Sequence, residues 1–141
     1  MNSQLSSRQV LLLSEANFPH DFIQSYFGGR GYNVCQHALD DYQNADINVV
    51  NINPDDLSGI VLSGMVENSD VGNLAGFVSD IRNKFSNVPI LLLCENKIRK
   101  ENRLEISKAA KEHFKALQGF KAEKSVEEDL EKLTTDFFIG A

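Results

Sequence analysis

The sequence predicts a doubly wound α/β domain with a five-stranded parallel sheet, strand order 2-1-3-4-5, and α-helices on both faces. The first observation is a set of short, continuously apolar runs, of which 10–13, 59–64 and 88–94 are the clearest. Strands that are buried on both faces have this pattern. The second observation is that amphipathic helical patterns alternate with these runs. Right-handed crossovers through those helices form a parallel sheet and give the predicted strand order.

The first half of the chain predicts two strands, at 10–13 and 32–35, joined by a helix. Asn17 and Pro19 suit the start of this helix, and a run of glycines ends it. Its apolar side chains recur at spacings of three and four, and so lie on one face: Phe18, Phe22, Ile23, Tyr26 and Phe27. Residues 38–56 fit either a loop or an irregular helix, with turn chemistry at the end that leads into the next strand.

The middle of the chain predicts two central strands, 59–64 and 88–94, with an amphipathic helix between them. The apolar residues of segment 71–85 follow a period of 3.6 residues. Gly72 and Gly76 each weaken this helix by ~1 kcal/mol relative to alanine. We expect these glycines to allow the helix a close approach to the sheet.

The last third predicts a mostly solvated helix over 97–112, a short edge strand over 114–120, and a final helix that begins with the capping-box pattern at Ser125. The first of these helices has a thin apolar stripe, formed by Ile98, Leu104, Ile106, Ala109 and Ala110. We expect residues 1–8 to be a polar lead-in, 9–134 to form the domain, and 135–141 to begin a linker to a further domain.

Composition limits the partners and the compartment. The net charge of −6 disfavours nucleic acid and anionic membranes. No apolar run reaches the ~18 residues that span a bilayer, and the polar start has no secretory h-region, so we expect a cytoplasmic protein. Cys35 and Cys94 are expected to be buried thiols, and their spacing to the histidines does not suit a metal. We expect no cofactor and no enzymatic activity.

The strand order is flavodoxin-like and resembles that of a CheY-like receiver domain, whose phosphorylation site lies at the carboxyl ends of the central strands. Such a site needs an acidic pair for magnesium, an aspartate as phosphoacceptor, and hydroxyl and lysine donors for the phosphoryl oxygens. The corresponding positions here hold Ser14 and Glu15, then Ser63 (or Gly64 if the register shifts by one residue), then Cys94. Lys121 and Lys124 are candidates for the lysine. The sequence therefore predicts a degenerate pocket that does not form an aspartyl phosphate.

Three stretches, 10–17, 58–64 and 88–95, with 126–133 after them, resemble the N-terminal receiver-like domain of FleQ/FlrA-type flagellar master regulators. These regulators are sigma-54-dependent transcription activators. A small residue replaces the phosphoacceptor after Ile60-Val61-Leu62, and the fourth strand reads Pro-Ile-Leu-Leu-Leu-Cys-Glu. The tail Phe138-Ile139-Gly140-Ala141 is similar to the segment that opens the AAA+ ATPase domain in such activators.

The resemblance implies a regulatory and dimerisation domain, followed in the full protein by an AAA+ ATPase and a DNA-binding domain, in control of flagellar genes. The implied partners are a second copy and the chain's own ATPase domain. Receiver-like domains commonly pair through their fourth helix, fifth strand and fifth helix, where a dimer face would contain Arg103, Ile106, Lys108, Lys111 and Phe120.

Two other functions fit the same fold order. Inducible basic amino-acid decarboxylases have a similar flavodoxin-like N-terminal wing that assembles oligomers. A following pyridoxal-phosphate domain would favour this wing, and the apolar tail favours the ATPase instead. A stand-alone flavin enzyme would need a Ser/Thr/Gly-rich phosphate loop after the first strand. Residues 14–18, Ser-Glu-Ala-Asn-Phe, do not provide one.

Overall fold

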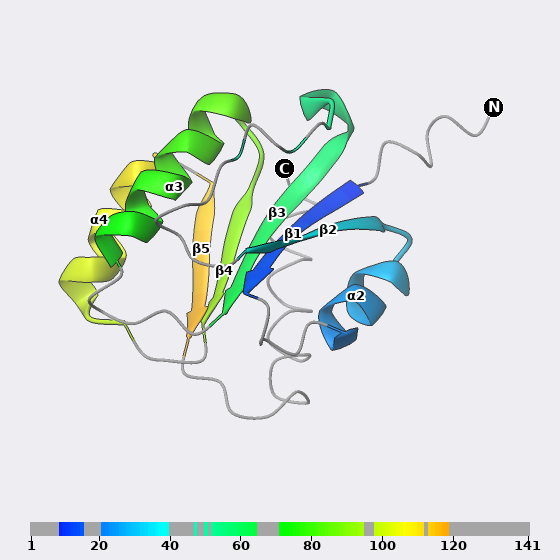
Figure 1. Cartoon of the computed structure of the whole chain (residues 1–141), viewed down its shortest axis with the longest axis horizontal. Coiled ribbons are helices and arrows are strands. Elements are labelled where there is room, and N and C mark those ends of the chain that lie inside the picture. Colours follow the sequence, from blue (N-terminus) through cyan, green and yellow to red (C-terminus); the bar gives the residue numbers. More distant parts are fainter. Residues whose placement is uncertain are drawn as a thin grey trace.

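The computed structural model describes residues 9–15, 21–39, 47, 50, 52–64, 71–94, 98–111 and 113–118 of the chain. Its five strands form one sheet in the order β2-β1-β3-β4-β5, and every neighbouring pair is parallel (Figure 1). This arrangement confirms the predicted α/β fold and its strand order.

The elements lie close to the predicted runs. In chain order they are β1 (Gln9–Glu15), α2 (Asp21–Gly28), β2 (Asn33–Leu39), the 3₁₀ helix η2 (Pro54–Asp56), β3 (Leu57–Gly64), α3 (Val71–Lys84), β4 (Ile90–Cys94), α4 (Lys100–Ala110) and β5 (Phe114–Gln118). β4 begins at Ile90 rather than Val88, because Pro89 has no N–H to donate to a ladder. The predicted caps at Asn17 and Pro19, the helix from Ser125 and the two terminal segments lie outside the described residues.

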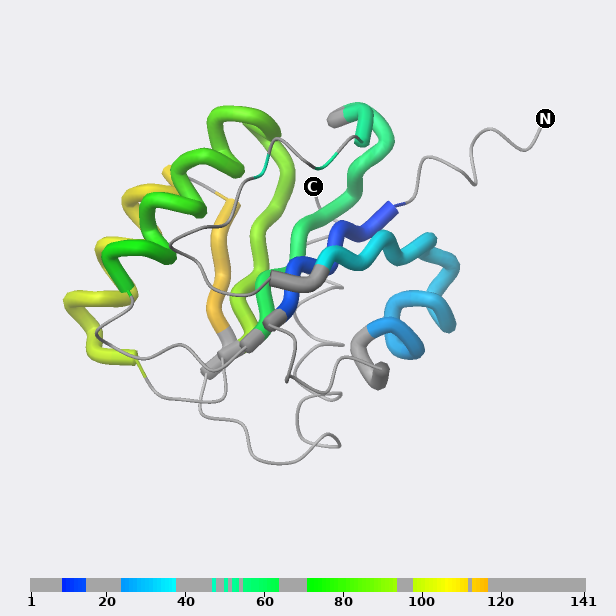
Figure 2. Tube along the Cα trace, viewed as in Figure 1, coloured from blue at the N-terminus to red at the C-terminus, as the bar shows by residue number. Residues whose placement is uncertain are grey.

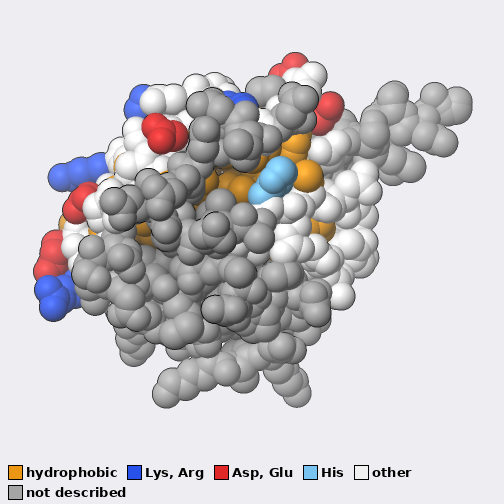
Figure 3. Space-filling model, viewed as in Figure 1, with side chains coloured by type: hydrophobic (Ala, Val, Ile, Leu, Met, Phe, Trp, Pro, Cys, Tyr) orange, Lys and Arg blue, Asp and Glu red, His pale blue; other side chains and the backbone are white. Residues whose placement is uncertain are grey.

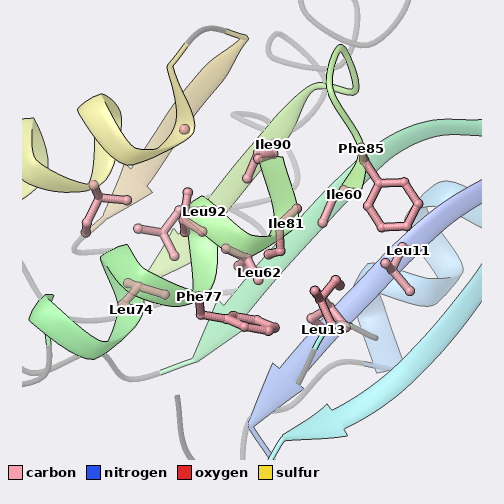
Figure 4. Packing of buried hydrophobic residues seen from close by; sticks show 14 of the residues in the cluster. Leu11, Leu13, Ile60, Leu62, Leu74, Phe77, Ile81, Phe85, Ile90 and Leu92 are labelled. Carbon is pink, nitrogen blue, oxygen red and sulfur yellow. The ribbon is translucent and has the colours of Figure 1, made fainter. Parts of the chain in front are cut away.

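The helices lie on both sides of the sheet. Figures 1 and 2 show α3 and α4 next to each other on one side and α2 on the other. Because side chains alternate along a strand, each strand contributes to both layers. The core cluster joins strand residues to α3 and to Phe85 just after it (Figure 4), namely Leu11, Leu13, Ile60, Leu62, Ile90 and Leu92 with Leu74, Phe77, Ile81 and Phe85. The alternate strand positions, also buried, are Val10, Leu12, Val61, Leu91 and Leu93.

In its described residues, the segment between β2 and β3 contains the short helix η2 and no α-helix. Ile47 and Val50 nevertheless belong to the same core cluster as Leu11 and Leu13. The ammonium of Lys84, at the end of α3, donates to the carbonyl oxygens of Ile47 at 3.3 Å and Val50 at 2.6 Å. Ile47 and Val50, which a backbone hydrogen bond of 3.0 Å joins, are therefore tied to the end of α3.

One charged side chain of α3 is buried. Arg82 is 3% exposed. Its Nε donates to the carbonyl of Ala110 at 2.6 Å, and its Nη1 donates to the carbonyls of Phe85 at 2.9 Å and Val88 at 2.8 Å. Arg82 thus binds the last residue of α4, the residue just after α3 and the approach to β4. Its position four residues after the buried Val78 places it on the core-facing side of α3.

The expectation for Gly72 and Gly76 is wrong. Both are exposed, and a Cβ at either position would meet no atom within 4 Å. Their absent side chains therefore allow no close contact and only weaken the helix.

We predict that Gly72→Ala and Gly76→Ala each raise the free energy of unfolding, by about 1 kcal/mol. Thermal and urea unfolding would measure this gain. Gly31→Ala is the matched control with the opposite sign, because Gly31 has φ 88°, where alanine is strained. A loss of stability in the two α3 variants would contradict the prediction.

Candidate functional site

The carboxyl edge of the central strands is the first candidate site. The register pairs Ser14 of β1 with Ser63 of β3, and Gly64 of β3 with Cys94 of β4. Four of the predicted pocket residues, Ser14, Glu15, Ser63 and Cys94, thus lie at neighbouring strand ends. The side chains of Glu15 and Cys94, and the whole of Lys121 and Lys124, lie outside the described residues. The placement of Glu15, Cys94, Lys121 and Lys124 in the pocket therefore stays a prediction.

Ser63, at the phosphoacceptor position, is closed off. Its side chain is 0% exposed, and within the described structure its hydroxyl makes no hydrogen bond. An unpaired buried hydroxyl costs about 1–3 kcal/mol. A phosphoryl donor in solvent has no surface of this side chain to approach.

Ser14, its neighbour across the ladder, is equally buried but has a partner. It is 0% exposed, and its Oγ accepts from Nε2 of Gln36 on β2 at 3.4 Å. The Oε1 of Gln36 accepts in turn from Nε2 of Gln24 on α2. This chain of amides links α2, β2 and β1, so Ser14 contributes to packing and offers no free oxygen pair for a cation.

The second candidate site is an open groove of about 280 Å³ between α4 and β5. Its apolar lining comes from Leu104 on α4 and from Phe114 and Ala116 on β5. Leu104 is 51% exposed and is the large hydrophobic side chain that the described structure leaves open to solvent. The prediction that Leu104 belongs to the buried stripe is wrong. Ile106 and Ala110 are the buried residues of α4, and helical geometry turns Leu104 away from them.

Three cations, Lys100, Arg103 and Lys115, surround this apolar surface. None of their side chains takes part in an ion pair in the described part of the chain. The acids of α4, Glu101 and Glu105, do not line the groove. Each follows a lining residue by one position and so points about 100° further round the helix. Figure 3 shows charged side chains along the margin of the molecule where α4 runs.

Of the residues predicted to form a dimer face, Arg103, Lys108 and Lys111 are exposed and Ile106 is buried. Arg103 lines the groove, whereas Lys108 and Lys111 are exposed outside it. Ile106 is 0% exposed and packs in the core, so it cannot contact a second copy in this fold. Phe120 lies outside the described residues. Sequence spacing missed Lys100, Leu104 and Lys115, because the groove forms only where β5 lies beside α4.

The structure also bears on the predictions about the Cys35 thiol, metal binding and membrane-spanning helices. Cys35 is a partly exposed free thiol, 3.8 Å from Nε2 of His37, rather than the buried thiol that we expect from the sequence. It is on β2, at the edge of the sheet, where one side has no neighbouring strand among those described. In the described ranges no three His, Cys, Asp or Glu side chains are placed to hold a metal. No described helix is long and apolar enough to cross a membrane.

Comparison with known proteins places the fold. No family model and no curated protein sequence matches the chain. A pilus assembly-related protein from Burkholderia pseudomallei is similar in structure, with a TM-score of 0.59, 12% identity and 92% of each chain covered. Chemotaxis protein CheY4 from Vibrio cholerae is also similar, with a TM-score of 0.54, 16% identity, and coverage of 88% of this chain and 96% of its own. The chain therefore has a receiver-like fold.

Proposed function

We propose that this chain is an atypical receiver-like regulatory domain that acts through protein contacts and is not switched by phosphorylation. The observation that supports this most is the burial of Ser63. A receiver domain presents a carboxylate to a phosphoryl donor at this position. This chain has a hydroxyl there with 0% exposure. The regulatory part rests on the fold and on the chemotaxis protein among the structural neighbours.

The finer proposal is that the domain belongs to a sigma-54-dependent activator of flagellar genes and modulates an attached AAA+ ATPase. It is supported by the resemblance of the stretches 10–17, 58–64 and 88–95 to the FleQ/FlrA-type regulators. Determining the coding sequence that follows residue 141 tests it. A Walker A motif supports the proposal, and a pyridoxal-phosphate domain contradicts it in favour of the decarboxylase wing.

We predict that the chain forms no aspartyl phosphate. Incubation with a small phosphoryl donor, such as acetyl phosphate, and magnesium should leave the intact mass unchanged. The reason is that Ser63 is buried and is no carboxylate. A genuine receiver domain, treated in parallel, is the positive control. Addition of one phosphoryl group to this chain, retained at neutral pH and lost in hydroxylamine, would contradict the proposed function.

A further inference from the structure

The edge strand β2 holds a thiol and an imidazole side by side. Cys35 and His37 are two residues apart on this strand, so their side chains lie on the same face of the sheet. Sγ of Cys35 is 3.8 Å from Nε2 of His37, and both side chains are partly exposed. Gln36, between them, faces the other way and accepts from Gln24 of α2. The pair is therefore reachable from solvent, on the face opposite to α2.

The separation of this pair suits two ligands of one Zn²⁺ ion. In tetrahedral sites, zinc lies about 2.3 Å from a cysteine sulfur and about 2.0–2.1 Å from a histidine nitrogen. Those bond lengths place the two ligand atoms about 3.6 Å apart, close to the 3.8 Å between Sγ and Nε2. Structural zinc sites have four ligands, most often thiolates and imidazoles. One chain thus supplies half of such a site at β2.

The sequence of β2 leaves this edge of the sheet open to pairing. Edge strands usually carry charged residues, above all lysine, or proline, because their unpaired N–H and C=O groups otherwise bind another strand. The opposite edge strand, β5, contains Lys115. β2 reads Asn-Val-Cys-Gln-His-Ala-Leu, without Lys, Arg, Asp, Glu or Pro, and no described strand lies on its outer side (Figure 1). Although the chain has a net charge of −6, two copies can meet along this strand without like charges facing each other.

Antiparallel pairing of β2 with a second copy brings the ligands of both chains together. A twofold interface places a strand against its own duplicate. β2 has seven residues with Gln36 at the centre, so only the register centred on Gln36 pairs the whole strand. This register sets Cys35 opposite the partner's His37. Side chains that are directly opposite point to the same face, with Cβ atoms about 4.5–5.5 Å apart. Two thiols and two imidazoles then gather on one face.

We propose that β2 pairs with β2 of a second copy and that the two copies bind one Zn²⁺ ion through Cys35 and His37 of each chain. Each thiol releases its proton to solvent as its sulfur binds the metal. Spacing along the chain gives no sign of this site, because two of the four ligands come from another copy. This inference goes beyond the proposed function and does not rest on it.

The test is sedimentation velocity of the 141-residue chain, in a non-thiol reductant, with and without Zn²⁺. We expect zinc to convert monomer into dimer with one ion per two chains, and EDTA to reverse this. Co²⁺ in place of Zn²⁺ should give the visible absorption of a tetrahedral site with thiolate ligands. Cys35→Ser and His37→Asn should each raise the zinc concentration needed for dimerisation by about a hundredfold or more, because each removes two of the four ligands.

His113→Asn is the matched control. His113 is exposed and precedes β5 at the other edge of the sheet, and asparagine tolerates its φ of 52°. This variant should change zinc-dependent dimerisation by less than about twofold, because it removes no ligand. Gln36→Glu tests the register without loss of a ligand. It sets two carboxylates opposite each other and should weaken the dimer severalfold, and an equal mixture with Gln36→Lys should restore it. Urea unfolding checks that each variant is folded, and the Cys35 and His37 variants decide the result if the Gln36 variants are not.

Several results would overturn the proposal. Zinc leaves the chain monomeric, binds as one ion per chain, or still drives dimerisation of His37→Asn. A dimer that responds neither to zinc nor to the Gln36 variants overturns it as well. The proposed function fails by a different measurement, the appearance of a phosphorylated species. The two failures can therefore be told apart.

Discussion

Arg82→Ala is expected to lower the free energy of unfolding by about 3 kcal/mol, a large share of the roughly 5–15 kcal/mol typical of a domain. Arg82 is 3% exposed and donates to three backbone carbonyls, those of Phe85, Val88 and Ala110. Truncation leaves these acceptors without that donor. Each buried unpaired group costs about 1–3 kcal/mol, and any hydrogen bond from an entering water molecule reduces this cost. The urea midpoint, measured with an unchanged m-value, would report the loss.

Two further variants identify the cause of that loss. Arg82→Lys keeps the positive charge, but its single ammonium cannot reproduce the fork of the guanidinium, so we expect an intermediate loss. Lys108→Ala removes an exposed cation and should change stability by less than about 0.5 kcal/mol. If Arg82→Ala costs less than about 1 kcal/mol, the three hydrogen bonds do not hold the ends of α3 and α4 in place.

Ser63→Asp, which places a carboxylate at the receiver's phosphoacceptor position, is expected to destabilise the fold by about 3 kcal/mol or more. The side chain at this position is 0% exposed, and its hydroxyl finds no partner within the described structure. A carboxylate there would be desolvated without compensation. Ser63→Ala should have the opposite effect, a gain of about 1 kcal/mol, because it removes an unpaired buried hydroxyl.

Ser63→Asn separates the effect of charge from that of size, since it matches aspartate in shape. The difference between the Asp and Asn variants should grow as pH rises above about 4, where the carboxyl of the unfolded chain ionises and favours unfolding. Urea unfolding at several pH values measures this. A stable Ser63→Asp variant that accepts a phosphoryl group would show that the position opens to solvent, and would contradict the closed site.

Much of the fold could be predicted because burial on both faces leaves a local pattern. Runs such as Val10–Leu13 have no polar alternation, and the apolar residues of α3 keep the helical period, so element type and order were predictable. The structure of the segment between β2 and β3 could not be predicted from the sequence. Ile47 and Val50 are held by the core and by Lys84, and neither contact leaves a local pattern.

The candidate sites, too, could be predicted only in part from the sequence. The strand-end positions of Ser14 and Ser63 followed from the run lengths, but their burial depends on the layers that pack against the sheet. Leu104 fitted the apolar stripe by spacing and is 51% exposed. Lys115 lies on β5 and Lys100 on α4, and only their packing brings them to one groove.

The sequence by itself determined the α/β class, the strand order and the absence of an acid at the phosphoacceptor position. These depend on periodicity and residue identity, which are local. The tertiary structure alone decided that Ser63 is closed to solvent, that Arg82 binds the ends of α3 and α4, and that Lys100, Arg103 and Lys115 line one groove with Leu104. Those properties depend on distances between elements far apart in the chain, and hydrophobic burial sets these distances without regard to any single motif.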